Sequence, residues 1–186
     1  DSTELMVGNV HRFCSKFLFE QDKIPADSAI IDDEEAVSII ADYRNEDEEG
    51  VTRDFNRYKG YQTIIFFQHF IYQMEHQHPW KYYLHPESFT DDDREAIKQI
   101  CKSQKREYNE QAVIDIYHHA QQYMDEANVP GLDAKTADKI RVLLWKMYYA
   151  ACYAQYKEEN HLLDFEDLLL KTYEIGRASC RERVSS

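Results

Sequence analysis

Two groups of residues have the chemistry needed to hold a nucleic acid, and the first lies near the start of the chain. Asn9, His11, Arg12 and Phe13 follow Gly8, and they combine an amide, an imidazole, a guanidinium and an aromatic ring. We expect a helix to begin at Asn9, where unpaired N–H groups favour an anion, so that His11 and Arg12 could contact a phosphate. An ordinary solvated first helical turn would explain the same residues.

The second group is a basic stripe. Lys98, Lys102, Lys105 and Arg106 recur at i, i+4, i+7 and i+8 in a helix that Thr90 is expected to cap. On an otherwise acidic chain such a stripe could contact the DNA backbone. Three aspartates follow Thr90. The helix dipole favours acidic residues at the start of a helix and basic residues at its end, so a purely structural role of the basic stripe stays open.

Three carboxylates lie close together near the end of the chain, and such a group could indicate paired-carboxylate acid–base catalysis. Asp164, Glu166 and Asp167 are better explained as a helix start, in which Asp164 caps the first turn and Asp167 stands at its third position. Leu163 and Leu168 have the spacing of a hydrophobic staple around that cap. No catalytic residue is therefore predicted.

Histidines are the remaining chemical signal. His69, His76, His78 and His85 invite a metal site, but residues two apart face alike on a strand and not on a helix, and no cysteine lies nearby. The interpretation preferred is polar loop histidines before Pro79 and Pro86, with no metal ligand.

The elements that must position these residues are mostly helical. Residues 5–7 are expected to end a strand, and Gly8-Asn9 to turn the chain into an amphipathic helix. The apolar face of that helix is Val10, Phe13, Cys14, Phe17 and Leu18. Asp32, with Glu35 three residues later, predicts a second capped helix. The acidic segment 45–50 is interpreted as a solvated turn.

Further along, residues 64–74 are apolar on almost every side, which predicts a central buried helix. A helix is expected over about 110–127, followed by a break at Pro130-Gly131. Asp133 then opens the longest helix, to about Glu159, before the helix capped by Asp164.

Two segments resemble a known family. Leu-Asp-Phe-Glu-Asp-Leu-Leu at 163–169 resembles the Leu-Asp-Phe-Asp-Asp-Leu-Leu segment of UvrD/Rep/PcrA-type superfamily 1 DNA helicases. Gly-Asn-Val-His-Arg-Phe-Cys at 8–14 resembles their Gly-Thr-x-His-x-Phe-Cys element, with Asn9 in place of the threonine. The two stand in the family's order, at about the separation that its helical insertion, subdomain 1B, requires.

The resemblance implies a mainly α fold: a 1B-like helical bundle over 23–160, with short remnants of an α/β RecA-like motor domain over 1–22 and 161–174. Residues 175–186 resemble the translation of a short-read sequencing adapter and are set apart from the fold. They hold three Arg and one Glu, so without them the net charge changes from −13 to −15. The chain begins at Asp1 and not Met, so we expect the N-terminus to be incomplete, and the adapter-like tail leads us to expect that the natural gene was cut off before it.

The resemblance also implies a function. The parent protein is expected to be an ATP-dependent 3′–5′ DNA helicase that uses ATP and Mg²⁺ and acts on single strands and duplex junctions together with its remaining subdomains. This chain has no G-x-x-x-x-G-K-[ST] sequence and no strand ending in Asp-Glu, so we expect it to bind neither cofactor and not to hydrolyse ATP. Two alternatives stay open: an acidic helical protein-interaction module without enzymatic activity, and a His-rich metalloprotein.

Composition limits these readings. The net charge of −13 opposes non-specific DNA binding, so any contact must be local. With 14 Tyr, 9 Phe and few Gly or Pro, the chain favours a packed helical protein over disorder. Four scattered cysteines signal neither disulfides nor zinc, and no long apolar run is present, so we expect a cytoplasmic protein without a membrane partner.

Overall fold

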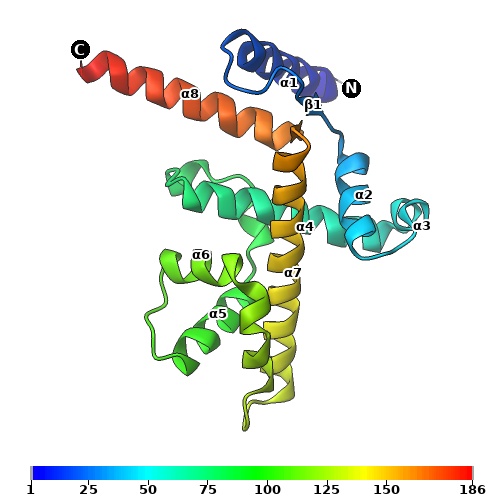
Figure 1. The fold of residues 1–186 in the computed structure, drawn as a ribbon, viewed down its shortest axis with the longest axis vertical. Helices are drawn as coiled ribbons and strands as arrows, with labels where there is room; N and C mark the ends of the chain where they lie inside the picture. Colours follow the sequence, from blue (N-terminus) through cyan, green and yellow to red (C-terminus); the bar gives the residue numbers. More distant parts are fainter. Residues whose placement is uncertain (1, 186) are drawn as a thin grey trace. The chain divides into compact units, whose positions relative to one another are not determined.

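The chain is mainly helical, as predicted (Figure 1). The structure is a computed structural model that describes the backbone of residues 2–185 and the side chains of residues 8–183. It divides into two compact units. The terminal unit comprises both ends of the chain, up to Ala36 and from Tyr156, and the inserted unit comprises Val37–Gln155. The sequence had placed the corresponding boundaries at residues 22 and 160.

The terminal unit is built around two helices and one pair of very short strands. Its elements are α1 (Ser2–Glu20), β1 (Ala29–Ile30), β2 (Leu162–Leu163) and α8 (Phe165–Ser185), with the first turn of α2 and the last turn of α7. The strands are parallel, with Ala29 opposite Leu162 and Ile30 opposite Leu163. The Ile31 N–H donates to the Leu163 carbonyl at 2.9 Å, so two segments far apart in sequence are joined by backbone hydrogen bonds.

The core of the terminal unit lies where α1 packs against α8. Its buried residues are Cys14, Leu18, Ile24, Leu163 and Leu168. Burying one leucine contributes on the order of 1.5–3 kcal/mol, so this small cluster is the main apolar stabilisation of the unit. Leu163 and Leu168 are buried together, as expected for a staple around the α8 cap.

The prediction of a strand end at residues 5–7 is wrong, because α1 is helical from Ser2 onward and passes through Gly8 and Asn9 without a turn. A helix satisfies its backbone N–H and C=O groups internally, whereas a strand here would need a partner strand. One interior glycine costs only about 1 kcal/mol. The predicted apolar face is also only half right: Cys14 and Leu18 are buried, but Val10 and Phe13 are exposed.

Residues 175–185, which the sequence set apart from the fold, continue the last helix. Helix α8 continues to Ser185, through the segment that resembles an adapter, and Ile175 packs against the terminal core. The segment contains Arg, Ala and Glu, which are good helix formers, and no proline to stop the helix.

The inserted unit is entirely helical apart from its loops. Its elements are α2 (Asp33–Tyr43), α3 (Glu48–Arg53), α4 (Phe55–Glu75), η1 (Trp80–Tyr82), η2 (Pro86–Ser88), α5 (Asp91–Ser103), α6 (Glu110–His118), η3 (Ala120–Asn128) and α7 (Ala134–Glu159), where η marks a 3₁₀ helix. The boundaries between the two units fall within α2 and α7. None of the helices in the described part of the chain is long and apolar enough to cross a membrane.

The predicted central helix is confirmed as α4. Phe67, His69, Ile71 and Gln73 are all fully buried on it. The predicted break at Pro130-Gly131 is also confirmed, with Gly131 in the left-handed region at φ +85°. The helix expected over 110–127 is instead α6 followed by the tighter η3, because the backbone leaves the α conformation at His119.

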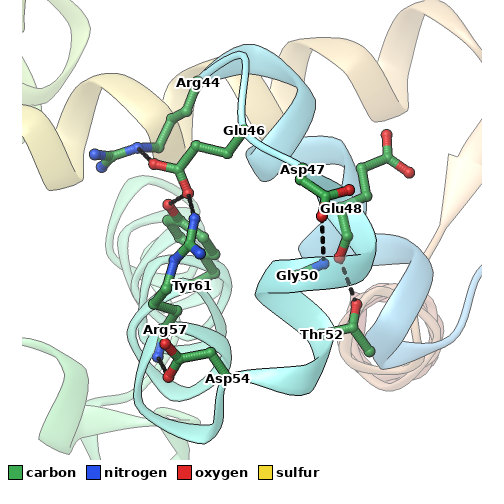
Figure 2. A network of polar contacts seen from close by, with 9 residues as sticks. All are labelled: Arg44, Glu46, Asp47, Glu48, Gly50, Thr52, Asp54, Arg57 and Tyr61. Carbon is green, nitrogen blue, oxygen red and sulfur yellow. Dashed lines mark hydrogen bonds and ion pairs between the residues drawn. The ribbon is translucent and has the colours of Figure 1, made fainter.

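The acidic segment 45–50 is largely exposed, as the sequence predicts for a solvated turn, but Glu46 within it is partly buried and bonded to α4 (Figure 2). Glu46 accepts hydrogen bonds from the Tyr61 hydroxyl at 2.5 Å, the Arg57 guanidinium at 2.6 Å and Arg44 Nε at 3.0 Å. The Tyr61 hydrogen bond and the two arginines lower the pKa of Glu46. The Asp47 carboxylate caps α3 by accepting from the Gly50 N–H at 3.0 Å. The segment therefore ties the end of α2 to α4.

Candidate nucleic-acid interface

Three of the four residues predicted near the chain start share one exposed face of α1. Asn9, Arg12 and Phe13 are related by i, i+3 and i+4, so they project from the same side of the helix, and all three are exposed. The Phe13 ring is 65% exposed and stacks loosely on Phe17, with ring centroids 6.3 Å apart. An exposed ring beside a guanidinium and an amide is able to stack on a base while the polar groups contact its phosphate.

His11 lies on another side of the same helix and faces inward. Its ring stacks on Phe165 of α8, with centroids 4.5 Å apart and planes 9° from parallel. Phe165 is part of the second segment that resembles the helicases, so this stack joins the two segments. Sequence reasoning did not single out Phe165. Phe165 could have been found in the sequence from its position directly after the α8 cap residue, beside the predicted core.

The surroundings of His11 are acidic. Partial loss of hydration raises the pKa of Asp33, although its surface is exposed, and the nearby charges of Glu166, Asp164 and Asp32 raise it further, while His11 opposes them. A phosphate placed beside His11 would be repelled by these carboxylates. The exposed Arg12 is therefore better placed than His11 to meet an anion, whereas the free N–H groups expected at Asn9 are absent, because α1 begins at Ser2 and Asn9 lies inside the helix.

The carboxylates at the start of α8 have a structural partner. Lys157 is 5% exposed, and its Nζ lies 2.7 Å from Asp167 Oδ2 and 3.3 Å from Asp164 Oδ2. Burial alone would lower the pKa of Lys157, but the charges and hydrogen bonds of the two aspartates outweigh burial and raise it. The predicted cap is confirmed: the Asp167 N–H donates to Asp164 Oδ1 at 2.9 Å, and the Asp164 N–H to Asp167 Oδ2 at 3.0 Å.

In the inserted unit, the four predicted basic residues do not form one stripe. Lys98 and Lys102 are exposed one turn apart on α5, but the helix ends at Ser103. Lys105 lies beyond it, exposed and in a left-handed conformation at φ +53°. The i, i+7, i+8 spacing assumed a helix three residues longer than the one that forms.

Arg106 is held inside the unit. Its Nη1 lies 2.6 Å from Asp115 Oδ2 and 3.2 Å from the Tyr123 hydroxyl, which itself donates to Asp115 Oδ2 at 2.6 Å. The Asp115 hydrogen bond and charge raise the pKa of Arg106. This network connects the loop after α5 to α6 and η3, so Arg106 already has a structural role.

A residue that sequence reasoning missed stands beside the lysines. Tyr108 is partly exposed, and Lys98 Nζ lies 5.3 Å from its ring centroid. An aromatic residue two positions after a basic run was the available signal, because stacking rings interleaved with cations are typical of single-strand binding surfaces. Lys98, Lys102, Lys105 and Tyr108 are therefore the exposed candidates of the inserted unit.

The histidines occupy different settings. The loop prediction is wrong for His69, which is fully buried on α4. His76 follows the end of α4, with Nδ1 2.9 Å from the Tyr72 carbonyl oxygen. His85 stacks on Phe66 with centroids 3.7 Å apart.

Comparison with known proteins adds no family. No protein-family model matches the sequence, and neither a curated protein nor a solved structure was found to match the chain. The function of this chain is therefore inferred from its own residues and their arrangement.

Proposed function

We propose that this chain is a fragment of an ATP-dependent, UvrD-like superfamily 1 DNA helicase that contributes local DNA contacts. The observation that carries the proposal is the organisation of the chain: both ends form one unit, and residues 37–155 are inserted between them as a separate helical unit. An insertion into a motor domain has this arrangement. The two segments that resemble the helicases lie on α1 and at the start of α8, which share one core.

ATP and Mg²⁺ belong to the parent protein in this proposal, since the chain has no phosphate-binding loop of the Walker A type. The role left to the chain is DNA contact. In the terminal unit the Asn9–Arg12–Phe13 face would hold a single strand, with Phe13 stacking on a base. In the inserted unit Lys98, Lys102 and Lys105 would contact phosphates of the duplex near a junction.

The first test measures single-strand binding by fluorescence anisotropy with a labelled oligonucleotide at low salt. We expect the double variant Arg12→Ala/Phe13→Ala to weaken binding by about tenfold, because stacking on one base is worth roughly 1–3 kcal/mol. Lys16→Ala/Phe19→Ala is the matched control, since it removes an exposed cation and a partly exposed ring from the same helix. Equal losses in the two variants would remove the assigned face from the proposal.

The second test measures duplex binding over a salt series. Lys102→Glu/Lys105→Glu should weaken binding and flatten its salt dependence, because each phosphate contact contributes a slope of roughly 0.9 in log–log form. Lys59→Glu/Lys135→Glu changes the net charge equally at exposed lysines elsewhere in the same unit. If the two double variants have the same slope, the lysines after α5 make no specific contact.

The source DNA separates the proposal from its main alternative. A phosphate-binding loop encoded upstream and an Asp-Glu strand soon after Tyr173 would support a motor protein. A complete reading frame with neither would favour an acidic helical protein-interaction module.

A further inference from the structure

The inserted unit contains a pocket that is not lined by any of the three lysines proposed to contact DNA. Its volume is about 400 Å³, within the range of about 300–1,000 Å³ that is usual for small-molecule sites. The floor and walls come from α4, the 3₁₀ turns that follow it, and the starts of α5 and α6. The lining residues used below are Phe70, Met74, Trp80, Phe89, Arg94 and Val113.

The walls of the pocket are largely aromatic. Phe70 packs edge-on against Tyr83 at 5.3 Å, with an interplanar angle of 80°, and lies 5.5 Å from Phe89. Met74 adds an adaptable thioether, which packs well against rings. Trp80 lines the pocket yet is 83% exposed, which is unusual for so large an apolar side chain.

One cation lies among these rings. The Arg94 guanidinium is half-buried, with its carbon 4.7 Å from the Phe89 ring centroid. Its ion-pair partner is Asp91, at 3.1 Å, whose side chain is 97% exposed. Exposed pairs of this kind contribute little, so Arg94 can exchange Asp91 for a carboxylate that binds it in a bidentate manner. Glu110 also lines the pocket, but it is exposed, and its repulsion of an acid is weakened by solvent and salt.

We propose that this pocket binds small, planar, hydrophobic carboxylates, with the ring system against Phe70, Met74 and Phe89 and the carboxylate on Arg94. The apolar walls supply most of the affinity, and Arg94 supplies the preference for an acid. A neutral molecule of the same shape would keep the first contribution and lose the second.

The experiment titrates the full chain with 2-naphthoate and with 2-naphthamide, a neutral analogue of the same shape, by calorimetry. We expect naphthoate to bind at least about tenfold more tightly, because a hydrogen-bonded charge is worth roughly 1.5–3 kcal/mol. Binding should shift the indole N–H resonance of Trp80 and not that of Trp145, the other tryptophan, with the two signals assigned from Trp145→Phe.

Variants locate the site. Arg94→Gln should reduce naphthoate affinity about tenfold and leave naphthamide affinity unchanged, whereas Lys135→Gln, which removes an exposed cation elsewhere in the same unit, should change neither. Val113→Phe, which fills the pocket, should abolish both. Equal affinity of the wild-type chain for acid and amide, absence of binding at millimolar concentration, or a shift of Trp145 alone would each overturn the proposal, and the first two are measured on the wild-type chain.

Discussion

The same long helix stabilises the start of two other helices, and it does so in two different ways. At α5, Thr90 and Asp93 form the capping box, and Lys146 of α7 pairs with Asp93 Oδ2 and donates to the Ser88 carbonyl at 2.8 Å. At α8, Asp164 and Asp167 form the box, and Lys157 of α7 pairs with both. Each pair lies within its own unit of the chain.

The difference is the residue at the cap. Threonine at α5 is neutral, so Lys146 balances one buried carboxylate and completes its hydrogen bonds with a backbone oxygen. Aspartate at α8 adds a second carboxylate, so Lys157 must balance two, the buried Asp164 and the partly buried Asp167. A buried cation between two anions is strongly required, because its removal leaves more uncompensated charge than removal of one member of a simple pair. The same capping motif is therefore a local helix cap in the inserted unit, and in the terminal unit it also holds the ion pairs of a buried lysine.

The largest expected effect is the loss of a lysine. Lys157→Met should lower the free energy of unfolding by about 3–5 kcal/mol, because buried Asp164 and partly buried Asp167 both lose their cation. Lys146→Met should cost less, about 1–3 kcal/mol, because only one carboxylate, that of Asp93, loses its cation. Urea unfolding followed by circular dichroism measures both.

Lys135→Met is the control for this pair of variants, because Lys135 is exposed on the first turn of the same helix. It should change stability by less than about 0.5 kcal/mol. A Lys146→Met variant less stable than Lys157→Met would contradict the ranking of the two caps.

A smaller effect is expected from making the α8 cap resemble the α5 cap. Asp164→Thr keeps an oxygen for the Asp167 N–H but leaves Lys157 with one carboxylate, so we expect a loss of about 1–2 kcal/mol. Asp164→Ala also removes the cap and should cost roughly 1 kcal/mol more. Urea titration of both variants beside Thr90→Ala separates the cap contribution from the charge contribution. If the Thr and Ala variants are equally unstable, the charge of Asp164 is the whole effect.

The smallest effect concerns pH. The folded pKa of Lys157 lies above its unfolded value, so its contribution is complete below about pH 10 and is lost as the pH rises through the folded pKa. The stability difference between the wild type and Lys157→Met should therefore shrink above about pH 10. Burial and the Glu46 hydrogen bond raise the pKa of Tyr61 to about 12. The stability that Tyr61 contributes to the inserted unit is therefore also lost as the pH rises from about 10 towards 12.

Urea unfolding at a series of pH values from 8 to 12 measures this effect. The free energy of unfolding of the Tyr61→Phe variant should fall less steeply with rising pH than that of the wild type. The further loss caused by adding Lys157→Met to this variant should still become smaller as the pH rises. A difference that stays constant across the series would show that Lys157 does not act through its charge.

Local signals in the sequence determined the helix starts. Asp32 with Glu35, Thr90 with Asp93 and Asp164 with Asp167 were readable because a cap depends on residues three apart, and the structure contains these boxes. The central position of α4 and the break at Gly131 were readable for the same reason, since both follow from composition over a short window.

Only the tertiary structure decided where the charges go. Arg106 belonged to a stripe by spacing, yet Asp115 and Tyr123 hold it. Glu46 belonged to a solvated turn by composition, yet Arg57 and Tyr61 bind it from α4. Partners nine or more residues away have no periodic signature in the sequence, and the free energy of a charge is set by the groups that surround it after folding. The sequence by itself therefore determined the helices and their starts, and the fold determined which charged residues remain available for binding.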